Sequence, residues 1–235
     1  MNRVARARAA RDLATREAAV AHRVAALLLE YPGPDVIALV PSLRAAVDEL
    51  PVGLAGPLTR TLDHVAGTEP TALAAQYVET FDLRRRCSLY LTYYAYGDTR
   101  RRGVALVELK QAYRAAGLEL ADDELPDHLA VLLEFASGPD QAAREAGLRL
   151  LLAHRAGLEL LRLALADAGS RWAGAVEAVC ATLPPLGGDD RAAVARLAAE
   201  GPPGEEVGLD APLDPTLRPT LDPYASAVSA PGARR

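Results

Sequence analysis

Apolar residues recur along most of this chain at intervals of three and four positions, which is the period of an α-helix. The first stripe contains Val20, Val24, Leu27 and Tyr31, on a helix that we expect to begin at Thr15. A Pro-Gly-Pro sequence at 32–34 ends it, because proline lacks a backbone N–H and cannot continue the helical hydrogen-bond ladder. The chain therefore opens with an amphipathic helix and a sharp break.

Similar stripes follow through most of the chain. They lie at 36–50, 54–65, 73–81, 106–116, 129–136, 158–165, 172–183 and 189–199. Pro41 indicates a kink or a break in the first of these, whereas 140–168 is predicted to form one long helical segment. Val and Ile are scarce beside Ala, Leu, Arg and Glu, which favours helix over sheet. We therefore predict an all-α fold, a single-domain bundle of about eight to ten helices.

Three residues are of types that commonly begin a helix. Asp98 is placed to accept hydrogen bonds from the first free amides of the helix that follows it. Pro126 suits the first helical position, and Ser170 is placed to cap a later helix. Residues 82–97 are ambiguous because their tyrosines and threonine favour strands. We interpret them as a short helix or turn, since no partner strand is predicted elsewhere.

The composition changes after residue 200. Seven of the 17 prolines lie in 201–235, and residues 213–224 repeat a four-residue unit that contains proline. Proline at every fourth position forbids helix and favours an extended, polyproline-like chain. We expect a flexible start at 1–14, one all-helical domain at 15–200, and a proline-rich disordered tail at 201–235.

The charge and the cysteines narrow the range of partners and locations. A net charge of −5 argues against a nucleic-acid partner, which usually needs a strongly basic face. No run of about 18 apolar residues is present, so no stable membrane insertion is expected. The arginine-rich start has no apolar segment typical of a secretory signal. We expect a cytoplasmic protein in which Cys87 and Cys180 are reduced thiols.

No motif for catalysis or for a cofactor is present in the sequence. A nucleophile elbow, a phosphate-binding glycine loop and a dinucleotide fingerprint are all missing. The four histidines are scattered, without ligand spacing to one another, to a cysteine or to a carboxylate. We therefore expect no metal site and no cofactor.

Tyrosine is concentrated in one stretch of the chain. Five of the eight tyrosines lie between 77 and 96, and four of these lie within 90–96. Because one helix face cannot bury four such rings, we expect some of them to line a surface groove. Tyrosine suits such a groove, since its ring is apolar and its tip is polar. The alternative is that these rings are simply part of the core.

Two arginine triplets flank the tyrosines, at 84–86 and 100–102. They either bind phosphate or RNA, or pair with neighbouring carboxylates on exposed turns. The second alternative is favoured, because Glu79, Asp82 and Asp98 lie close to them in the sequence.

An acidic cluster follows, made of Glu119, Asp122, Asp123, Glu124 and Asp127. It either docks a basic partner, such as an arginine-bearing peptide, or forms an ordinary solvated loop. Asp127 and His128 form either an acid/base pair or the start of a helix, with Glu124 and Asp127 complementing the helix dipole. The helix start is favoured, because adjacent side chains on a helix point about 100° apart.

The same stretches resemble a known family. Residues 77–82 (YVETFD), 88–94 (SLYLTYY) and 97–100 (GDTR) resemble the NarJ family, the assembly chaperones of respiratory nitrate reductase. Residues 124–129 (ELPDHL) resemble the E-P-x-D-H signature of the wider TorD/DmsD/NarJ superfamily, with one leucine inserted after the glutamate, as in the NarJ branch. The likeness is dense from 75 to 137 and does not include the tail.

The resemblance implies a cytoplasmic all-α chaperone that is not an enzyme. It would bind the N-terminal segment of the nitrate reductase catalytic (alpha) subunit until the molybdenum cofactor is inserted and the complex assembles. Cofactor-delivery proteins would be further partners. The client-binding residues that the resemblance implies by position are Tyr77, Phe81, Asp82, Tyr90, Tyr93, Tyr94, Asp98, Glu124, Asp127 and His128.

These residue types suit an aromatic groove with acidic edges. Such a groove would accept a helical client segment that has one apolar face and basic residues beside it. The alternative function is a generic helical adaptor for another peptide client, and only the identity of the partner separates the two.

Overall fold

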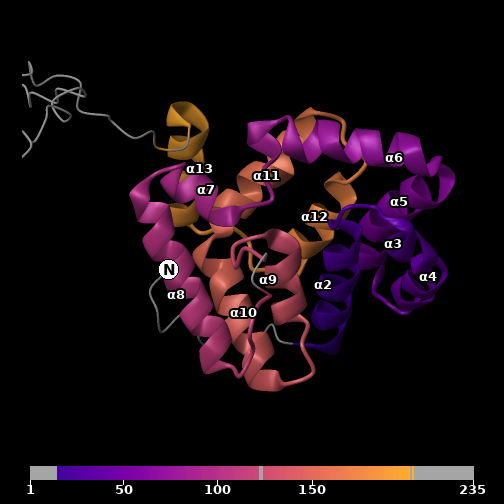
Figure 1. Cartoon of the computed structure of the whole chain (residues 1–235), viewed down its shortest axis with the longest axis horizontal. Helices are drawn as coiled ribbons and strands as arrows, with labels where there is room; N and C mark the ends of the chain where they lie inside the picture. Colours follow the sequence, from indigo (N-terminus) through magenta and orange to yellow (C-terminus); the bar gives the residue numbers. More distant parts are fainter. Residues whose placement is uncertain (1–14, 122–123, 202, 204–235) are drawn as a thin grey trace, which may run out of the picture. The chain divides into compact units, whose positions relative to one another are not determined.

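The computed structural model describes residues 15–121, 124–201 and 203, and this part of the chain is all-helical (Figure 1). Within it there are twelve α-helices. They are α2 (Arg16–Leu28), α3 (Pro34–Ala38), α4 (Val40–Asp48), α5 (Val52–Gly67), α6 (Pro70–Tyr77), α7 (Leu91–Tyr96), α8 (Arg100–Ala115), α9 (Leu129–Ala136), α10 (Gln141–Ala153), α11 (Arg155–Asp167), α12 (Ala173–Ala181) and α13 (Gly188–Glu200). A π-helical turn, η1 (Val78–Asp82), and a 3₁₀ turn, η2 (Arg85–Cys87), connect α6 to α7. The predicted all-α fold is confirmed.

The described residues belong to one compact unit. The segment predicted to be flexible, 1–14, lies outside the described residues, as do residues 202 and 204–235 of the predicted tail. No helix in the described ranges is both long enough and apolar enough to pass through a bilayer.

Two predicted helices are each divided into a pair, which accounts for part of the difference from the expected number. α3 ends at Ala38 and α4 begins at Val40, with Pro41 in the first turn of α4, where its missing N–H has no intrahelical partner to lose. The segment predicted to be one helix at 140–168 divides at His154 into α10 and α11. α10 packs on α9, whereas α11 packs on α7, α12 and α13, so the bend lets each half reach its own neighbours.

Side-chain caps begin some of these helices. The Thr15 hydroxyl accepts a hydrogen bond at 3.1 Å in the first turn of α2, which confirms the predicted start of that helix. Asp140 caps α10 in the same way at 2.8 Å. Ser170 does not cap α12, because Trp172 occupies the N-cap and the Ser170 hydroxyl accepts from the Trp172 N–H at 3.3 Å within the preceding turn.

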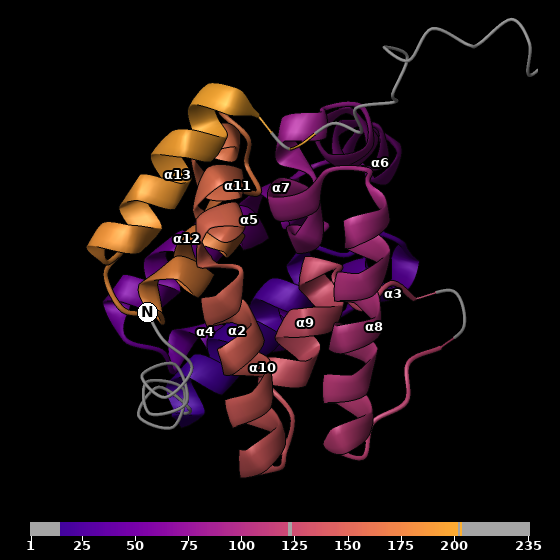
Figure 2. The same ribbon diagram turned by 90° about the vertical axis from the view of Figure 1, so that its left-hand side faces the viewer.

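The core lies where α2, α5, α9 and α12 meet. Six of the eight residues of α9 are buried, as expected of a helix that is apolar apart from Glu134, which is exposed and pairs with Arg23. α2 packs on α9, and α12 packs on both α5 and α2. In Figure 1, α3, α4 and α6 lie on one side of this core and α7, α8 and α13 on the other. The outermost helix of the second group is α13, which packs chiefly on α11 and has no buried residue (Figure 2).

α12 approaches α5 closely because Gly174 has no side chain. A Cβ atom at this position would lie 2.1 Å from the carbonyl oxygen of Pro57 and 2.8 Å from Oγ1 of Thr61. The Thr61 hydroxyl also donates to the carbonyl of Arg171 at 3.0 Å, just before α12. Backbone therefore packs directly on backbone, and this contact sets the distance between two core helices.

The close approach makes a substitution at Gly174 costly. Gly174→Ala should lower the free energy of unfolding by about 1–3 kcal/mol, because the new methyl group must push the two helices apart. Gly56→Ala is the matched control, since a Cβ on this α5 residue meets nothing within 4 Å. That change should raise stability by up to about 1 kcal/mol. Urea unfolding monitored by circular dichroism measures both, and equal effects would contradict the close approach.

His22 is a fully buried histidine between α2 and the end of α12. Its Nε2 lies 2.8 Å from Oγ1 of Thr182, whose hydroxyl donates to the Val179 carbonyl at 2.7 Å. Because the Thr182 hydroxyl hydrogen is used in the bond to Val179, the His22 Nε2–H is the donor to Thr182. Burial lowers the pKa of His22 to about 4, although the Ala136 backbone carbonyl opposes the shift. The ring is therefore neutral in the folded protein at neutral pH.

The buried imidazole makes the stability of the fold depend on pH. As the pH falls below 6.5 the unfolded chain binds a proton at His22, while the folded chain does not until about pH 4. The stabilising contribution is fully present above pH 6.5 and lost as the pH falls to 4, a loss of roughly 3 kcal/mol. His22→Gln should flatten the profile of unfolding free energy over this window. Profiles that run parallel in the variant and the parent would refute the assignment.

Candidate functional site

The two stretches that carry the family resemblance are joined through their backbones. Hydrogen bonds of 3.0 and 2.8 Å connect residues 89–91 to residues 127–129. Tyr90 and His128 face each other in this isolated antiparallel bridge. Their ring centroids lie 5.2 Å apart, with the planes inclined at 68°. We define these two paired segments as the clasp.

The clasp determines the local structure on both of its sides. Tyr90 is extended, and α7 begins directly after it, so the ambiguous stretch 82–97 contains the short helix that was predicted. His128 is the N-cap of α9. The prediction that Pro126 would open this helix was wrong, because the backbone of the next three residues is used in the clasp.

Asp127 is buried beneath the clasp, with 1% of its surface exposed. Its Oδ2 accepts a hydrogen bond from the Thr92 hydroxyl and lies 3.4 Å from Nη2 of Arg102. Arg102 also donates from Nε to the Thr92 hydroxyl at 3.2 Å. The same guanidinium lies over the Tyr90 ring, 5.4 Å from its centroid. One arginine thus neutralises a buried carboxylate and supports the exposed tyrosine of the clasp.

Two carboxylates predicted at helix starts are used in this network instead. Asp127 was expected to complement a helix dipole, but its carboxylate is buried against Arg102. Asp98 was expected to cap α8, but Thr99 is the N-cap and Asp98 Oδ1 lies 3.5 Å from Nη1 of Arg102. A guanidinium offers charge-assisted hydrogen bonds, which are stronger than those from neutral backbone amides.

Tyr77 and Phe81 belong to an aromatic group near the clasp. The Tyr77 ring centroid lies 4.8 Å from that of Phe81 and 5.6 Å from that of Tyr31. Tyr77 and Phe81 are buried, whereas Tyr31 is 55% exposed. The chain between the two buried rings is the π-helical turn η1, a rare conformation that is frequent at functional sites. The buried Tyr77 ring therefore supports Tyr31 and is itself packed against Phe81, so neither buried ring is free to contact a client.

Carboxylates gather around these rings. Burial raises the pKa of Glu30, the nearby Glu134 and Glu124 raise it further, and Arg23 opposes them. Burial likewise raises the pKa of Tyr77, with additional contributions from Asp82, Tyr90 and Glu30. The negative charges of Glu30, Glu124 and Asp82 therefore act on the same region as the Tyr90 ring.

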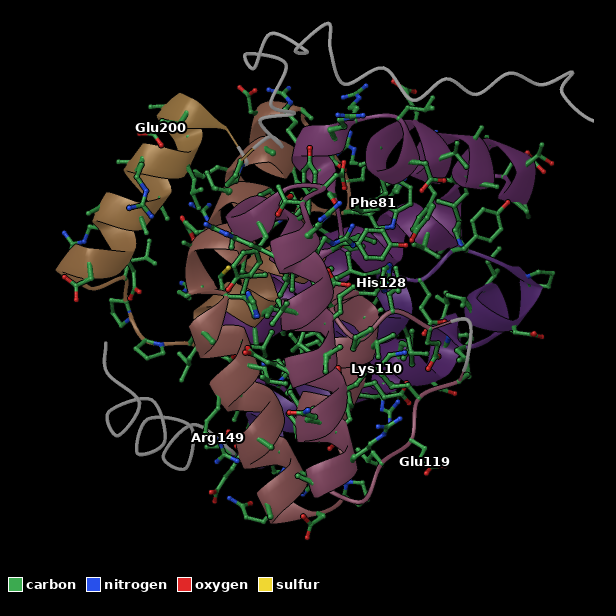
Figure 3. The ribbon with its side chains drawn as sticks, turned by 60° about the vertical axis from the view of Figure 1, so that its left-hand side comes forward. Phe81, Lys110, Glu119, His128, Arg149 and Glu200 are labelled. Carbon is green, nitrogen blue, oxygen red and sulfur yellow. The ribbon has the colours of Figure 1, made fainter. Side chains whose placement is uncertain are left out.

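Exposed apolar side chains adjoin two of these carboxylates in the chain, since Leu83 follows Asp82 and Leu125 follows Glu124. Leu83 is 73% exposed, Leu125 is 40% exposed and Tyr90 is 37% exposed. We define the clasp face as the surface made by Glu30, Tyr31, Asp82, Leu83, Tyr90, Glu124, Leu125 and His128. Figure 3 locates Phe81 and His128 among the surrounding side chains. The face combines exposed aromatic and aliphatic groups with negative charge.

Asp127 and His128 do not form an acid/base pair. The Asp127 carboxylate is engaged with Thr92 and Arg102. Burial lowers the pKa of His128, while Asp127 opposes this shift, so the ring is neutral at pH 7 and contacts Tyr90. Among the described residues, no group of three or more potential ligands is arranged to hold a metal ion. The clasp face therefore offers contact area and charge.

Tyr93 and Tyr94 lie apart from the clasp face. Both line a groove of about 650 Å³ between α7, α11 and α13. Tyr94 is otherwise buried, and its hydroxyl donates to the carbonyls of Arg86 and Ser88 at 3.0 and 2.9 Å. The charged residues of this groove are Arg85, Arg86 and Asp167.

Of the five tyrosines between 77 and 96, Tyr93 and Tyr94 line this groove, and Asp122 and Asp123 of the predicted acidic cluster lie outside the described residues. The groove lined by Tyr93 and Tyr94 carries arginine at its rim, whereas the carboxylates of Asp82 and Glu30 raise the pKa of Tyr77, which does not line that groove. Tyr90 lies in the extended backbone before α7, whereas Tyr93 and Tyr94 belong to the helix, so the rings divide between two surfaces.

The arginine triplets pair largely as predicted. Arg84 pairs with Glu79, and Arg102 with Asp98. Within the described ranges Asp82 takes part in no ion pair, and Arg86 pairs across to Asp167 of α11 at 2.8 Å. Carboxylates thus occupy several of the arginines that a nucleic-acid interface would need.

Comparison with known proteins identifies the family. The family model described as nitrate reductase delta subunit matches residues 44–178, more than half of the chain. The chain belongs to the nitrate reductase delta subunit family. The matched range includes all ten residues predicted for client binding and ends before α13.

Curated relatives of this delta subunit family member agree with the predicted resemblance. It is 39% identical over 163 residues to the nitrate reductase-like protein NarX of Mycobacterium tuberculosis, covering 69% of this chain and 24% of NarX. It is 35% identical over 119 residues to the probable nitrate reductase molybdenum cofactor assembly chaperone NarJ of Bacillus subtilis, covering 50% of this chain and 65% of that one. It is 35% identical over 125 residues to the nitrate reductase molybdenum cofactor assembly chaperone NarJ of Escherichia coli, covering 52% and 53%. The chain thus spans less than two thirds of each relative.

Several residues of the clasp face were not expected from the sequence of this delta subunit family member. Tyr31 and Glu30 lie at the end of the first apolar stripe, and only the packing of Tyr31 on Tyr77 brings them to the face. Leu83 and Leu125 adjoin predicted site residues, and their place in polar turns was an available signal of exposure. The role of Arg102 had no local signal, because its partner Asp127 lies 25 positions away.

The Arg102–Asp127 pair leads to a stability prediction. Arg102→Ala should lower the free energy of unfolding by about 2–4 kcal/mol, because it leaves a buried carboxylate without its counter-charge. Arg101→Ala, at an exposed neighbour, should change it by less than about 0.5 kcal/mol. Combining Arg102→Met with Asp127→Asn should recover part of the loss, since no uncompensated charge remains. Urea unfolding measures all three, and Arg102→Ala behaving like Arg101→Ala would refute the pairing.

Proposed function

We propose that this protein is an assembly chaperone for respiratory nitrate reductase. It binds the N-terminal segment of the catalytic subunit and supports molybdenum cofactor insertion and assembly of the complex. It acts in the cytoplasm and catalyses no reaction itself. Membership of the delta subunit family and the NarJ relatives support this proposal. The observation that carries it is the clasp face, where exposed aromatic and aliphatic groups lie among carboxylates.

The clasp face suits a basic amphipathic helix. Tyr31, Tyr90 and Leu83 provide exposed apolar contact area, and tyrosine is enriched among the residues that dominate binding energy. Glu30 and Glu124 provide negative potential, which attracts a cationic segment and orients it during encounter. A helix with an apolar ridge and basic residues on either side of it would match both the apolar contact area and the negative potential.

The face is held in place before a client arrives. Tyr90 is fixed by the clasp hydrogen bonds, by the His128 ring and by the Arg102 guanidinium. Tyr31 rests on the buried Tyr77 ring. Side chains that are ordered in the free protein lose less conformational entropy on binding, which favours affinity. Asp127, Tyr77 and Phe81 act in this proposal as positioning residues.

The proposed binding depends on charge in a testable way. Because Glu30, Asp82 and Glu124 are partly exposed, their attraction for a basic client should be screened by salt. The apolar contacts of Tyr31 and Tyr90 are much less sensitive to salt. Added salt should therefore slow association more than it hastens dissociation.

Tyr90 gives the sharpest test of the proposed function. Tyr90→Ala should reduce capture of the catalytic subunit, and of a peptide with its N-terminal sequence, by about tenfold or more. Tyr93→Ala is the matched control, because this tyrosine lies in the other groove and should leave capture unchanged. The measurement is co-purification from cells respiring nitrate, with the peptide affinity obtained by titration calorimetry.

The outcomes separate the alternatives. Recovery of the catalytic subunit that is lost in Tyr90→Ala and kept in Tyr93→Ala supports both the partner and the face. Capture lost only in Tyr93→Ala would move the client to the other groove. Recovery of an unrelated protein in place of the catalytic subunit would favour the generic adaptor.

A further inference from the structure

The groove between α7, α11 and α13 is a second surface suited to docking. Its volume is about 650 Å³, and its walls come from Tyr93 on one side and Leu197 on the other, with α11 between them. Figure 2 shows α13 lying along the outer side of α11, and Glu200, labelled in Figure 3, marks the end of this helix. None of the residues of the clasp face lines this groove.

The part of the groove formed by α11 is a row of residues at helical spacing. Leu160, Leu163, Ala164 and Asp167 stand at positions i, i+3, i+4 and i+7, so they occupy one face over two turns, a length of about 10 Å. Leu163 is 43% exposed although its neighbours in the row are apolar. Such a row, with a wall on each side, has the form into which the ridge of another helix packs.

Positive charge lies at one end of this row. Arg86 is 2.8 Å from Asp167, which places the arginines beside the C-terminal end of α11. Arg85 is exposed and lines the groove, and within the described ranges it takes part in no ion pair. Arg85 therefore stands at the rim, next to an apolar wall, without a partner among the carboxylates that the structure describes.

We propose that this groove docks an amphipathic helical segment of a partner protein, with leucine-type residues on one face and a carboxylate near its C-terminal end. The apolar side chains would pack against Leu160 and Leu163, and the carboxylate would pair with Arg85. The negative end of the helix dipole would lie at the same arginines, which sets the direction of the bound segment. This partner is distinct from the basic client proposed for the clasp face, because Arg85 and Arg86 would repel a basic segment.

The test uses a fluorescent peptide of about twelve residues, with leucines at positions i, i+3, i+4 and i+7 and glutamate in its last turn. Fluorescence anisotropy with the full chain measures its binding. Leu163→Asp should weaken binding by about tenfold or more, and Arg85→Glu by about threefold to tenfold. Arg101→Glu, the same charge change at an exposed site on α8, should leave binding unchanged, as should Tyr90→Ala.

Each further outcome is decisive. A peptide with glutamine in place of glutamate should bind more weakly, and equal binding of the two would overturn the charge pairing. Peptide binding that survives Leu163→Asp would overturn the site, provided that circular dichroism shows the variant folded. Displacement of the peptide by dodecanoate, with the peptide still bound normally by Arg101→Glu, would support the groove. Binding of dodecanoate without binding of the peptide would overturn the peptide as ligand and indicate an anionic amphiphile in its place. Loss of client capture in Tyr90→Ala is measured separately, so either proposal can fail without the other.

Discussion

A carboxylate that is removed from water needs a counter-charge, and Asp127 obtains one from Arg102. Arg102 belongs to α8 and Asp127 precedes α9, so this contact fastens the two segments that carry the family resemblance. The guanidinium also lies against the Tyr90 ring, and the position of an exposed aromatic group thus follows from a buried ion pair. The clasp face depends on an interaction that its client would not touch.

Two surfaces of opposite character are present on one small helical unit. The clasp face carries Glu30, Asp82 and Glu124, while the groove beside α13 carries Arg85 and Arg86. A segment of one charge cannot suit both, because like charges brought together oppose binding. An assembly factor with two such surfaces would be able to hold two different segments at the same time.

The fold was largely predictable, because apolar periodicity reports burial directly. α9 is almost entirely apolar and lies in the core, and Thr15 caps α2 at the predicted start of that helix. The errors arose where a distant partner outweighed a local preference. Asp98 has the right type and position for a cap, but Arg102 provides a stronger donor. The surplus of tyrosine predicted exposed rings, although it could not assign Tyr90 and Tyr94 to different environments, which depends on where α7 packs.

The attachment of α13 has a consequence for motion within the molecule. A helix with no buried residue, resting chiefly on a single neighbour, gives up little apolar contact when it lifts away. Its amides would then exchange with solvent through a local opening, while those of α9 and α12 would exchange only when the whole unit unfolds. The last described helix would thus behave as an independent cooperative segment, able to swing outward while the remainder of the bundle stays folded.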